Sequence, residues 1–263
     1  MSRSRPRPDA PPRSVWDRYW GEKGHVREVY PAVTDLLAEI AHVLPDVRGR
    51  RLLEVGAGTG REGHELARRG ALVCALDFSA EALRLSRQIS TDARLVRGDA
   101  LGSPFPDGTF DLVYHQGLLE HFSDPMPLLR ENRRVLKPGG WVLVDVPQRY
   151  HVYTLFKHTL IALNRWFAGW ETEFSPREIR ALVERAGFEC VRSYGYGMRP
   201  GLFYRVAREA LRPLGIRLPQ YPRLGPLHGA YRLWHRTLRR LEETRVGPYF
   251  TLTVGVIARR VGD

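Results

Sequence analysis

The chain is poor in cysteine. Its 263 residues include only Cys74 and Cys190, which are far apart and lie in separate apolar, strand-like segments. This arrangement fits neither a disulfide framework nor a metal-ligand motif. The pair His64-Glu65 also lacks the second histidine of the metalloprotease motif. We therefore expect a cytoplasmic protein with reduced thiols and no metal site.

Long hydrophobic runs are missing as well. No apolar run approaches the roughly 20 residues that a transmembrane helix needs, so no membrane span is predicted. Residues 1–14 are basic and rich in proline and lack the apolar stretch of a secretory signal, so we expect a disordered tail. With 43% hydrophobic and 27% charged residues overall, the chain has a globular composition, and we expect residues 15–263 to fold as one domain.

Lysine is scarce in a chain that is otherwise strongly basic. Lys+Arg number 41 against 29 Asp+Glu, for a net charge of +12, and the only lysines are Lys23, Lys137 and Lys157. So strong an arginine bias is typical of GC-rich coding and does not by itself indicate a nucleic-acid partner. Much of the excess lies between residues 192 and 245, where a field that attracts anionic partners is the alternative interpretation.

From residue 51 onward, strand-like and helix-like segments alternate. The strand candidates are short and apolar on both faces, as in parallel sheets covered by helices on both sides: 52–55, 72–76, 94–97, 110–115, 141–146, 188–194 and 249–260. The helix candidates are 30–44, 61–69, 80–90, 125–136 and 176–186. This order predicts an α/β fold with a doubly wound, seven-stranded, mostly parallel sheet. We also expect the last strand to run antiparallel beside 188–194.

Two segments are longer than the connections that a minimal fold of this kind needs. They follow the fifth and sixth strands, at about 147–173 and 195–247, and leave 46–146 and 174–263 as the core. Their apolar residues recur at helical spacing, which predicts amphipathic helices docked on the sheet domain. Since 147–173 leaves the carboxyl end of a strand, we also predict that it roofs a substrate pocket. Contact with a membrane surface is the alternative.

A glycine-rich turn follows the first strand, in the string EVGAGTG at residues 54–60. Glycines at alternate positions let the backbone turn tightly and approach a ligand closely. The third glycine comes one residue too early for a dinucleotide motif, and Arg61 excludes a P-loop.

Polar residues stand at the ends of the following strands. Asp77 ends the second strand, where an acid binds ribose hydroxyls in doubly wound folds, although it could instead cap the next helix. Asp99 follows the third strand, and Gln116 ends the fourth. Because such sheets bind ligands at this edge, a nucleoside-binding site is predicted there.

Several strings along the chain resemble successive motifs of class I S-adenosylmethionine-dependent methyltransferases, of the broad type that includes ubiquinone and menaquinone methylases. The strings are EVGAGTG at 54–60, Asp77, GDA at 98–100, FDLV at 110–113, GLLEHF at 117–122 and RVLKPGG at 134–140. The resemblance covers roughly residues 50–146 well. It implies a Rossmann-like methyltransferase fold, methyltransferase activity and S-adenosyl-L-methionine as the cofactor.

The resemblance also implies the cofactor-binding residues: Glu54, Gly56, Gly58, Gly60, Asp77, Phe78, Asp99, Ala100 and Gln116. Among these, Asp77 would bind the ribose and Asp99 with Ala100 the adenine edge. Tyr19 and Trp20 either cover the cofactor from the N-terminal side or pack in the core.

The methyl acceptor is less constrained. The aromatic residues of the two insertions favour a small apolar or aromatic metabolite, methylated on an O, N or C atom. A lipid or quinone at a membrane surface, an RNA, and a non-catalytic cofactor-binding partner are the alternatives, although no RNA-binding motif is present in the sequence. No oligomeric state is predicted.

A general base is needed only if the acceptor arrives protonated. We predict His121 and His151 as the catalytic residues, because both fall near the carboxyl edge of the sheet. A purely structural role is the alternative for each. Weaker candidates near the same edge are His115, Tyr153, Glu171 and Glu173.

Overall fold

The computed structural model describes residues 13–22, 33–163, 171–197 and 246–262, with short stretches between 204 and 244. Residues 1–12 of the predicted tail lie outside this part of the chain. So do residues 164–170 of the first predicted insertion and most of the second, so the helices expected there are not described.

The core is a seven-stranded sheet with the strand order β3-β2-β1-β4-β5-β7-β6. Its strands are β1 Arg51–Val55, β2 Leu72–Asp77, β3 Arg94–Arg97, β4 Phe110–Gln116, β5 Leu136–Pro147, β6 Phe188–Tyr196 and β7 Thr253–Arg260. The first five pair in parallel, and β7 runs antiparallel between β5 and β6. The predicted fold class and the antiparallel last strand are therefore confirmed.

Two strand boundaries differ from the prediction. β5 begins at Leu136 rather than at residue 141, because Leu136 already pairs with Phe110 before the register shifts to Leu112 and Trp141. Gly139, with a φ of 74°, takes the left-handed backbone conformation that this irregularity needs. β7 begins later than expected, because the short 3-10 helix η5, Gly247–Tyr249, precedes it.

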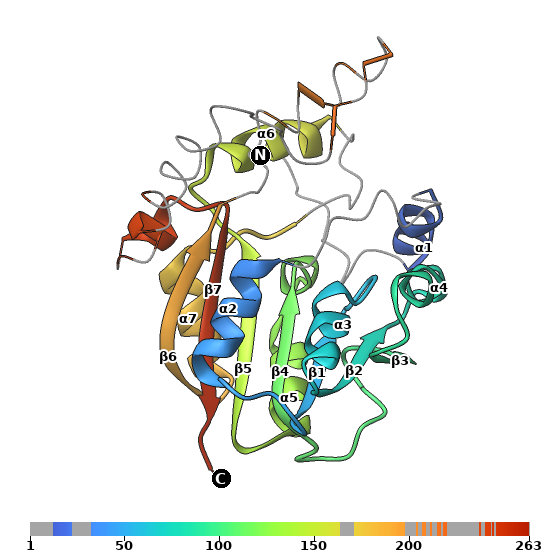
Figure 1. The fold of residues 1–263 in the computed structure, drawn as a ribbon. Coiled ribbons are helices and arrows are strands. Elements are labelled where there is room, and N and C mark those ends of the chain that lie inside the picture. The colour runs from blue at the N-terminus through green and yellow to red at the C-terminus, as the bar shows by residue number, and fades with distance from the viewer. Residues whose placement is uncertain are drawn as a thin grey trace.

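Helices cover both faces of the sheet (Figure 1). α2 (Thr34–Val43) and α3 (Arg61–Arg68) contribute Leu36, Ile40 and Leu66 to one buried cluster. On the other face, α5 (Met126–Val135) and α7 (Pro176–Arg185) contribute to a second cluster. α4 (Ala80–Ile89) packs against β2 and β3. Two cores separated by one sheet make the doubly wound architecture.

Local sequence signals explain where several helices begin. Ser175 and Glu178 form a reciprocal capping box at the start of α7, and Pro176 takes the first helical position. Ser79 caps α4 by accepting a hydrogen bond from the Ala82 N–H. These caps set the entry of both helices at the carboxyl edge of the sheet.

Three further elements lie at that edge. They are α1 (Arg13–Glu22), the 3-10 helix η2 (Leu119–His121) and α6 (Val152–Ala162). α1 packs beside α4, where Ser79 Oγ donates a 2.6 Å hydrogen bond to Asp17, and α6 lies above the end of β5 (Figure 1). In the described part of the chain, no helix is long and apolar enough to cross a membrane.

Candidate functional site

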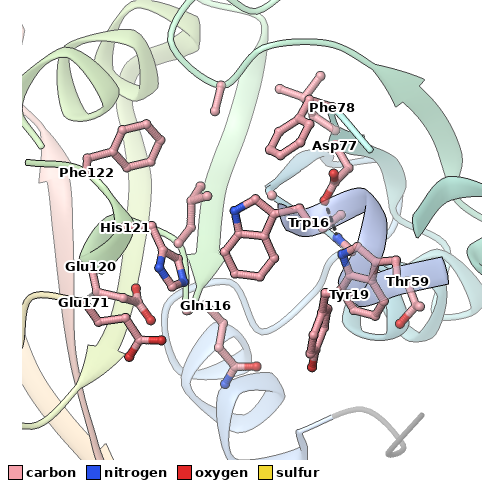
Figure 2. Close-up of a pocket in the computed structure, with 18 of the residues that line it drawn as sticks. Trp16, Tyr19, Thr59, Asp77, Phe78, Gln116, Glu120, His121, Phe122 and Glu171 are labelled. Carbon is pink, nitrogen blue, oxygen red and sulfur yellow. Dashed lines mark hydrogen bonds between the residues drawn. The ribbon is translucent and has the colours of Figure 1, made fainter. Parts of the chain in front are cut away.

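A cavity of about 500 Å³ opens at the carboxyl ends of β1, β2 and β4 (Figure 2). Its walls come from α1, from the loops after β1 to β4, and from the segment that follows β5. This volume falls within the range of about 300–1,000 Å³ that is usual for small-molecule sites. The edge of the sheet is the one where the sequence predicted a nucleoside.

The glycine loop forms the floor of the cavity. Gly56 and Gly58 line it with φ angles of 62° and 56°, which L side chains rarely adopt. A Cβ on Gly58 would come within 2.7 Å of the Trp20 ring, and one on Gly56 within 2.8 Å of Leu118. Only glycine fits both the conformation and the space, so the loop exposes bare backbone to a ligand.

Glu54 and Gly60 lie behind this loop and do not line the cavity. The Glu54 carboxylate accepts a 3.0 Å hydrogen bond from the Gly63 N–H, and burial together with Glu62 raises its pKa well above the usual value. Gly60 precedes α3, where an added Cβ would lie 3.3 Å from Ser86 Oγ. Both residues thus help to hold the loop, and a direct ligand contact for either stays a prediction.

Asp77 faces the cavity from the end of β2. Its Oδ2 accepts a 2.7 Å hydrogen bond from the Gly58 N–H and its Oδ1 a 2.8 Å bond from the Ser79 N–H. The side chain is buried, and burial raises its pKa against these two bonds. Each oxygen keeps a further lone pair, so the carboxylate can hold the loop and still accept from a ligand hydroxyl.

The adenine end predicted from the sequence lies beside Asp77. Phe78, Asp99 and Ala100 all line the cavity. The Asp99 carboxylate accepts a 2.9 Å hydrogen bond from the Leu101 N–H, which orients it at the loop after β3. An aromatic ring, a carboxylate and backbone amides are suited to a purine, since they offer stacking and hydrogen bonding together.

Gln116 lines the cavity from the end of β4. Its amide Nε2 donates to Asp145 Oδ2 at 3.2 Å and also to the Tyr196 hydroxyl. Asp145 is fully buried, and the Tyr196 hydroxyl donates to the same carboxylate oxygen. The amide is therefore tied on one side to two residues that do not line the cavity.

Burial raises the pKa of Asp145 to about 7, against the hydrogen bonds from Tyr196 and Gln116 and with the help of Glu62 and Glu39. The unfolded chain releases this proton near pH 4, so the folded state binds it more tightly. We expect stability to fall between about pH 4 and 7, by up to ~1.4 kcal/mol per pH unit. Urea unfolding at several pH values in this range measures the free energy of unfolding of the parent and of Asp145→Asn. If that free energy changes with pH in the same way in both proteins, the contribution of Asp145 is contradicted.

Aromatic side chains of α1 cover the cavity. Tyr19 and Trp20 line it as one of the two sequence interpretations expected, and Trp16 does so as well (Figure 2). Trp16 was not among the site residues predicted from the sequence, although its spacing of three and four residues from Tyr19 and Trp20 puts all three on one helix face. The Trp16 ring meets the His121 ring edge-on, with centroids 4.7 Å apart.

His121 lines the wall across the cavity from Asp77 (Figure 2). It is only 5% exposed, and burial with some help from Lys157 lowers its pKa to about 3. The imidazole is therefore neutral at physiological pH, and one of its nitrogens can accept a hydrogen bond from a group bound in the cavity.

The other two histidine candidates, His115 and His151, do not line the cavity. His151 caps α6, where its Nδ1 accepts a 3.1 Å hydrogen bond from the Tyr153 N–H, and it does not line the cavity. His115 lies in the interior of β4, and burial lowers its pKa to about 3. His151 therefore caps α6, and a catalytic role for it stays a prediction.

Two carboxylates adjoin His121 on the same wall. Figure 2 shows Glu120 and Glu171 pointing toward each other, and both line the cavity. Glu120 Oε2 has no hydrogen-bond partner among the described residues, and burial together with Glu171 raises the pKa of Glu120 well above its usual value. The buried Lys157 holds Glu171 at 2.7 Å and Glu173 at 2.8 Å. This cluster ties α6 to the cavity wall.

In the ranges that the structure describes, no group of three or more His, Cys, Asp or Glu side chains could hold a metal ion.

Comparison with known proteins adds to this picture. A family model described as "Methyltransferase domain" matches residues 53–144. The chain is 27% identical over 183 residues to the ubiquinone biosynthesis O-methyltransferase of Bordetella bronchiseptica, covering 65% of this chain and 76% of that protein. It is 42% identical over 96 residues to the demethylmenaquinone methyltransferase of Corynebacterium kroppenstedtii, covering 36% and 41% of the two chains.

The fold has counterparts among solved structures. One is phosphoethanolamine N-methyltransferase 2 of Haemonchus contortus in complex with S-adenosyl-L-methionine, with a TM-score of 0.61 and 18% identity over 94% of this chain and 57% of that one. At this identity the likeness establishes the fold.

Proposed function

We propose that this chain, a class I S-adenosylmethionine-dependent methyltransferase, methylates a hydroxyl oxygen of a small aromatic acceptor. The observation that carries this proposal is the cavity wall around His121. There a neutral imidazole lies between the aromatic rings of Trp16 and Phe122 and the carboxylates of Glu120 and Glu171 (Figure 2). Aromatic walls favour a flat, apolar acceptor. The name of the Bordetella bronchiseptica relative, which specifies O-methyl transfer in ubiquinone biosynthesis, supports an oxygen atom as the acceptor.

The cavity residues fit S-adenosylmethionine. We assign Asp77 to the ribose hydroxyls, Asp99 and the Ala100 backbone to the adenine edge, and Phe78 to the adenine face. The glycine loop would approach the methionine half, since a Cβ there would fill the space. When bound, this cofactor supplies a methyl group already activated by a positively charged sulfur.

The protein then has two tasks, alignment and proton removal. Holding acceptor and donor in line can supply about 7–11 kcal/mol of the barrier. Trp16 and the other α1 aromatics would exclude water from this arrangement. His121 would accept the hydroxyl proton while the new oxygen–carbon bond forms and the carbon–sulfur bond breaks.

A panel of matched acceptors tests this function. The purified protein is incubated with S-adenosylmethionine and a catechol, its monomethyl ether, its dimethyl ether or an aryl amine, and products are quantified by mass spectrometry. We expect transfer to the two compounds with a free hydroxyl and none to the dimethyl ether. Transfer to the amine alone would contradict the proposal. Mass spectrometry of small molecules that co-purify with the protein extends the panel toward the natural acceptor.

The predicted roof over the acceptor is tested through Lys157. In Lys157→Met, Glu171 and Glu173 lose their buried cation, and removing one partner of a buried pair costs about 3–5 kcal/mol. We expect a lower melting temperature and a higher acceptor KM, with S-adenosylhomocysteine affinity within about tenfold of the parent, or ~1.4 kcal/mol.

Lys137→Met is the matched control, because Lys137 pairs with Asp111 away from the cavity and is 41% exposed. Exposed pairs contribute about 0–1 kcal/mol, so this variant should change little. An unchanged acceptor KM in folded Lys157→Met would show that α6 does not shape the acceptor site.

A further inference from the structure

Three strands meet behind Gln116. In the sheet register, Gln116 of β4 pairs with Asp145 of β5, Asp145 pairs with Gly255 of β7, and Gly255 pairs with Tyr194 of β6. A Cβ on Gly255 would lie 2.1 Å from the Tyr194 ring. Because Gly255 has no side chain, the Tyr194 ring can lie over β7 at this point. The Tyr196 ring stacks on the Tyr194 ring, and its hydroxyl donates to the Asp145 carboxylate.

The donors and acceptors in this cluster set the orientation of the Gln116 amide. The Tyr196 hydroxyl gives its proton to Asp145 and therefore offers only lone pairs to Gln116. Asp145 Oδ2 accepts from this hydroxyl while Oδ1 has no partner among the described residues, so any proton on the carboxyl group sits on Oδ1, and Oδ2 likewise only accepts. Both neighbours therefore require the NH2 group of Gln116, whose Nε2 donates toward Asp145 and Tyr196. The carbonyl oxygen Oε1 is the part of the amide left to the cavity.

We propose that Asp145 and Tyr196 are positioning residues that turn the Gln116 carbonyl oxygen into the cavity, where it accepts a hydrogen bond from the α-ammonium group of the cofactor's methionine half. A carbonyl oxygen attracts an ammonium group and repels a carboxylate, so the orientation selects which end of the amino acid lies against β4. The inference rests on the cofactor site assigned under the proposed function, and it is independent of the acceptor.

The test compares two ligands by calorimetry. S-adenosylhomocysteine carries the amino-acid group, whereas 5′-methylthioadenosine shares the adenosine half and lacks that group. In Tyr196→Phe, we expect affinity for S-adenosylhomocysteine to fall about tenfold, or ~1.4 kcal/mol, while affinity for 5′-methylthioadenosine stays unchanged. Equal losses for both ligands, or no loss for either, would overturn the proposal.

Tyr194→Phe is the matched control. Tyr194 stacks on Tyr196 with centroids 6.3 Å apart, yet its buried hydroxyl has no hydrogen-bond partner among the described residues. The substitution makes the same chemical change beside the cluster, so the affinities of both ligands should stay at the parent value. A loss specific to S-adenosylhomocysteine in this variant would count against the role of the Tyr196 hydroxyl.

A double-mutant cycle with Gln116→Met separates positioning from a general structural effect. Since Met offers no carbonyl oxygen, Tyr196→Phe should cause no further loss of S-adenosylhomocysteine affinity in that background. Additive losses would overturn the proposal. Should Tyr196→Phe fail to fold, Asp145→Asn serves the same cycle, because its amide no longer requires one orientation of Gln116. If the parent itself binds neither ligand, the cofactor site is wrong, which is a separate outcome.

Discussion

Replacing His121 with phenylalanine is expected to lower kcat for methyl transfer by about 10²–10⁴-fold, the usual contribution of a general base. Phenylalanine keeps a ring against Trp16 but cannot accept a proton. Affinity for S-adenosylhomocysteine should stay near the parent value, because the ribose and adenine contacts assigned to Asp77 and Phe78 lie across the cavity from His121 (Figure 2). Single-turnover rates with a hydroxyl acceptor, together with calorimetry, measure the two quantities separately.

His151→Asn is the control for this experiment, since asparagine retains a cap for α6 and removes the other histidine that the sequence suggested. Its rate should match that of the parent. If kcat of the His121→Phe variant stays within about tenfold of the parent value, His121 does not act as the general base.

Asp77→Asn should weaken S-adenosylmethionine binding by about 1.5–3 kcal/mol, the usual worth of a hydrogen bond to a charged group. The amide can accept from only one of the two backbone groups, Gly58 N–H and Ser79 N–H, that the carboxylate now satisfies. The variant therefore loses both the ribose acceptor and part of the loop's support. Titration calorimetry measures the affinity, and circular dichroism establishes that the variant is folded.

Asp111→Asn is the matched control for Asp77→Asn. Asp111 also accepts from a backbone N–H, that of Arg51 at 2.8 Å, and it lies outside the cavity. Cofactor affinity should be unchanged in this variant. A folded Asp77→Asn protein that binds S-adenosylmethionine as tightly as the parent would show that Asp77 does not hold the ribose.

The sequence alone was sufficient for the sheet, its antiparallel last strand and the edge at which ligands bind. Glycine spacing at residues 54–60 and the acid at Asp77 are local signals, because a positive φ and a strand end depend on neighbouring residues. These signals pointed to Gly56, Gly58, Asp77 and Asp99, the family resemblance added Phe78, and all five line the cavity. The same local pattern could not separate Gly58, which lines the cavity, from Gly60, which packs against α4.

Tertiary packing decided which polar side chains share the site. His121 and His151 were equal candidates in the sequence, and only the position of α6 makes His151 a cap and leaves His121 on the cavity wall. Tyr196 reaches Gln116 from 80 residues away because the strand order places β6 only one strand, β7, from β5. Hydrophobic periodicity fixes which face of an element is buried, whereas hydrogen bonds between distant side chains depend on strand order and register, which no local spacing encodes.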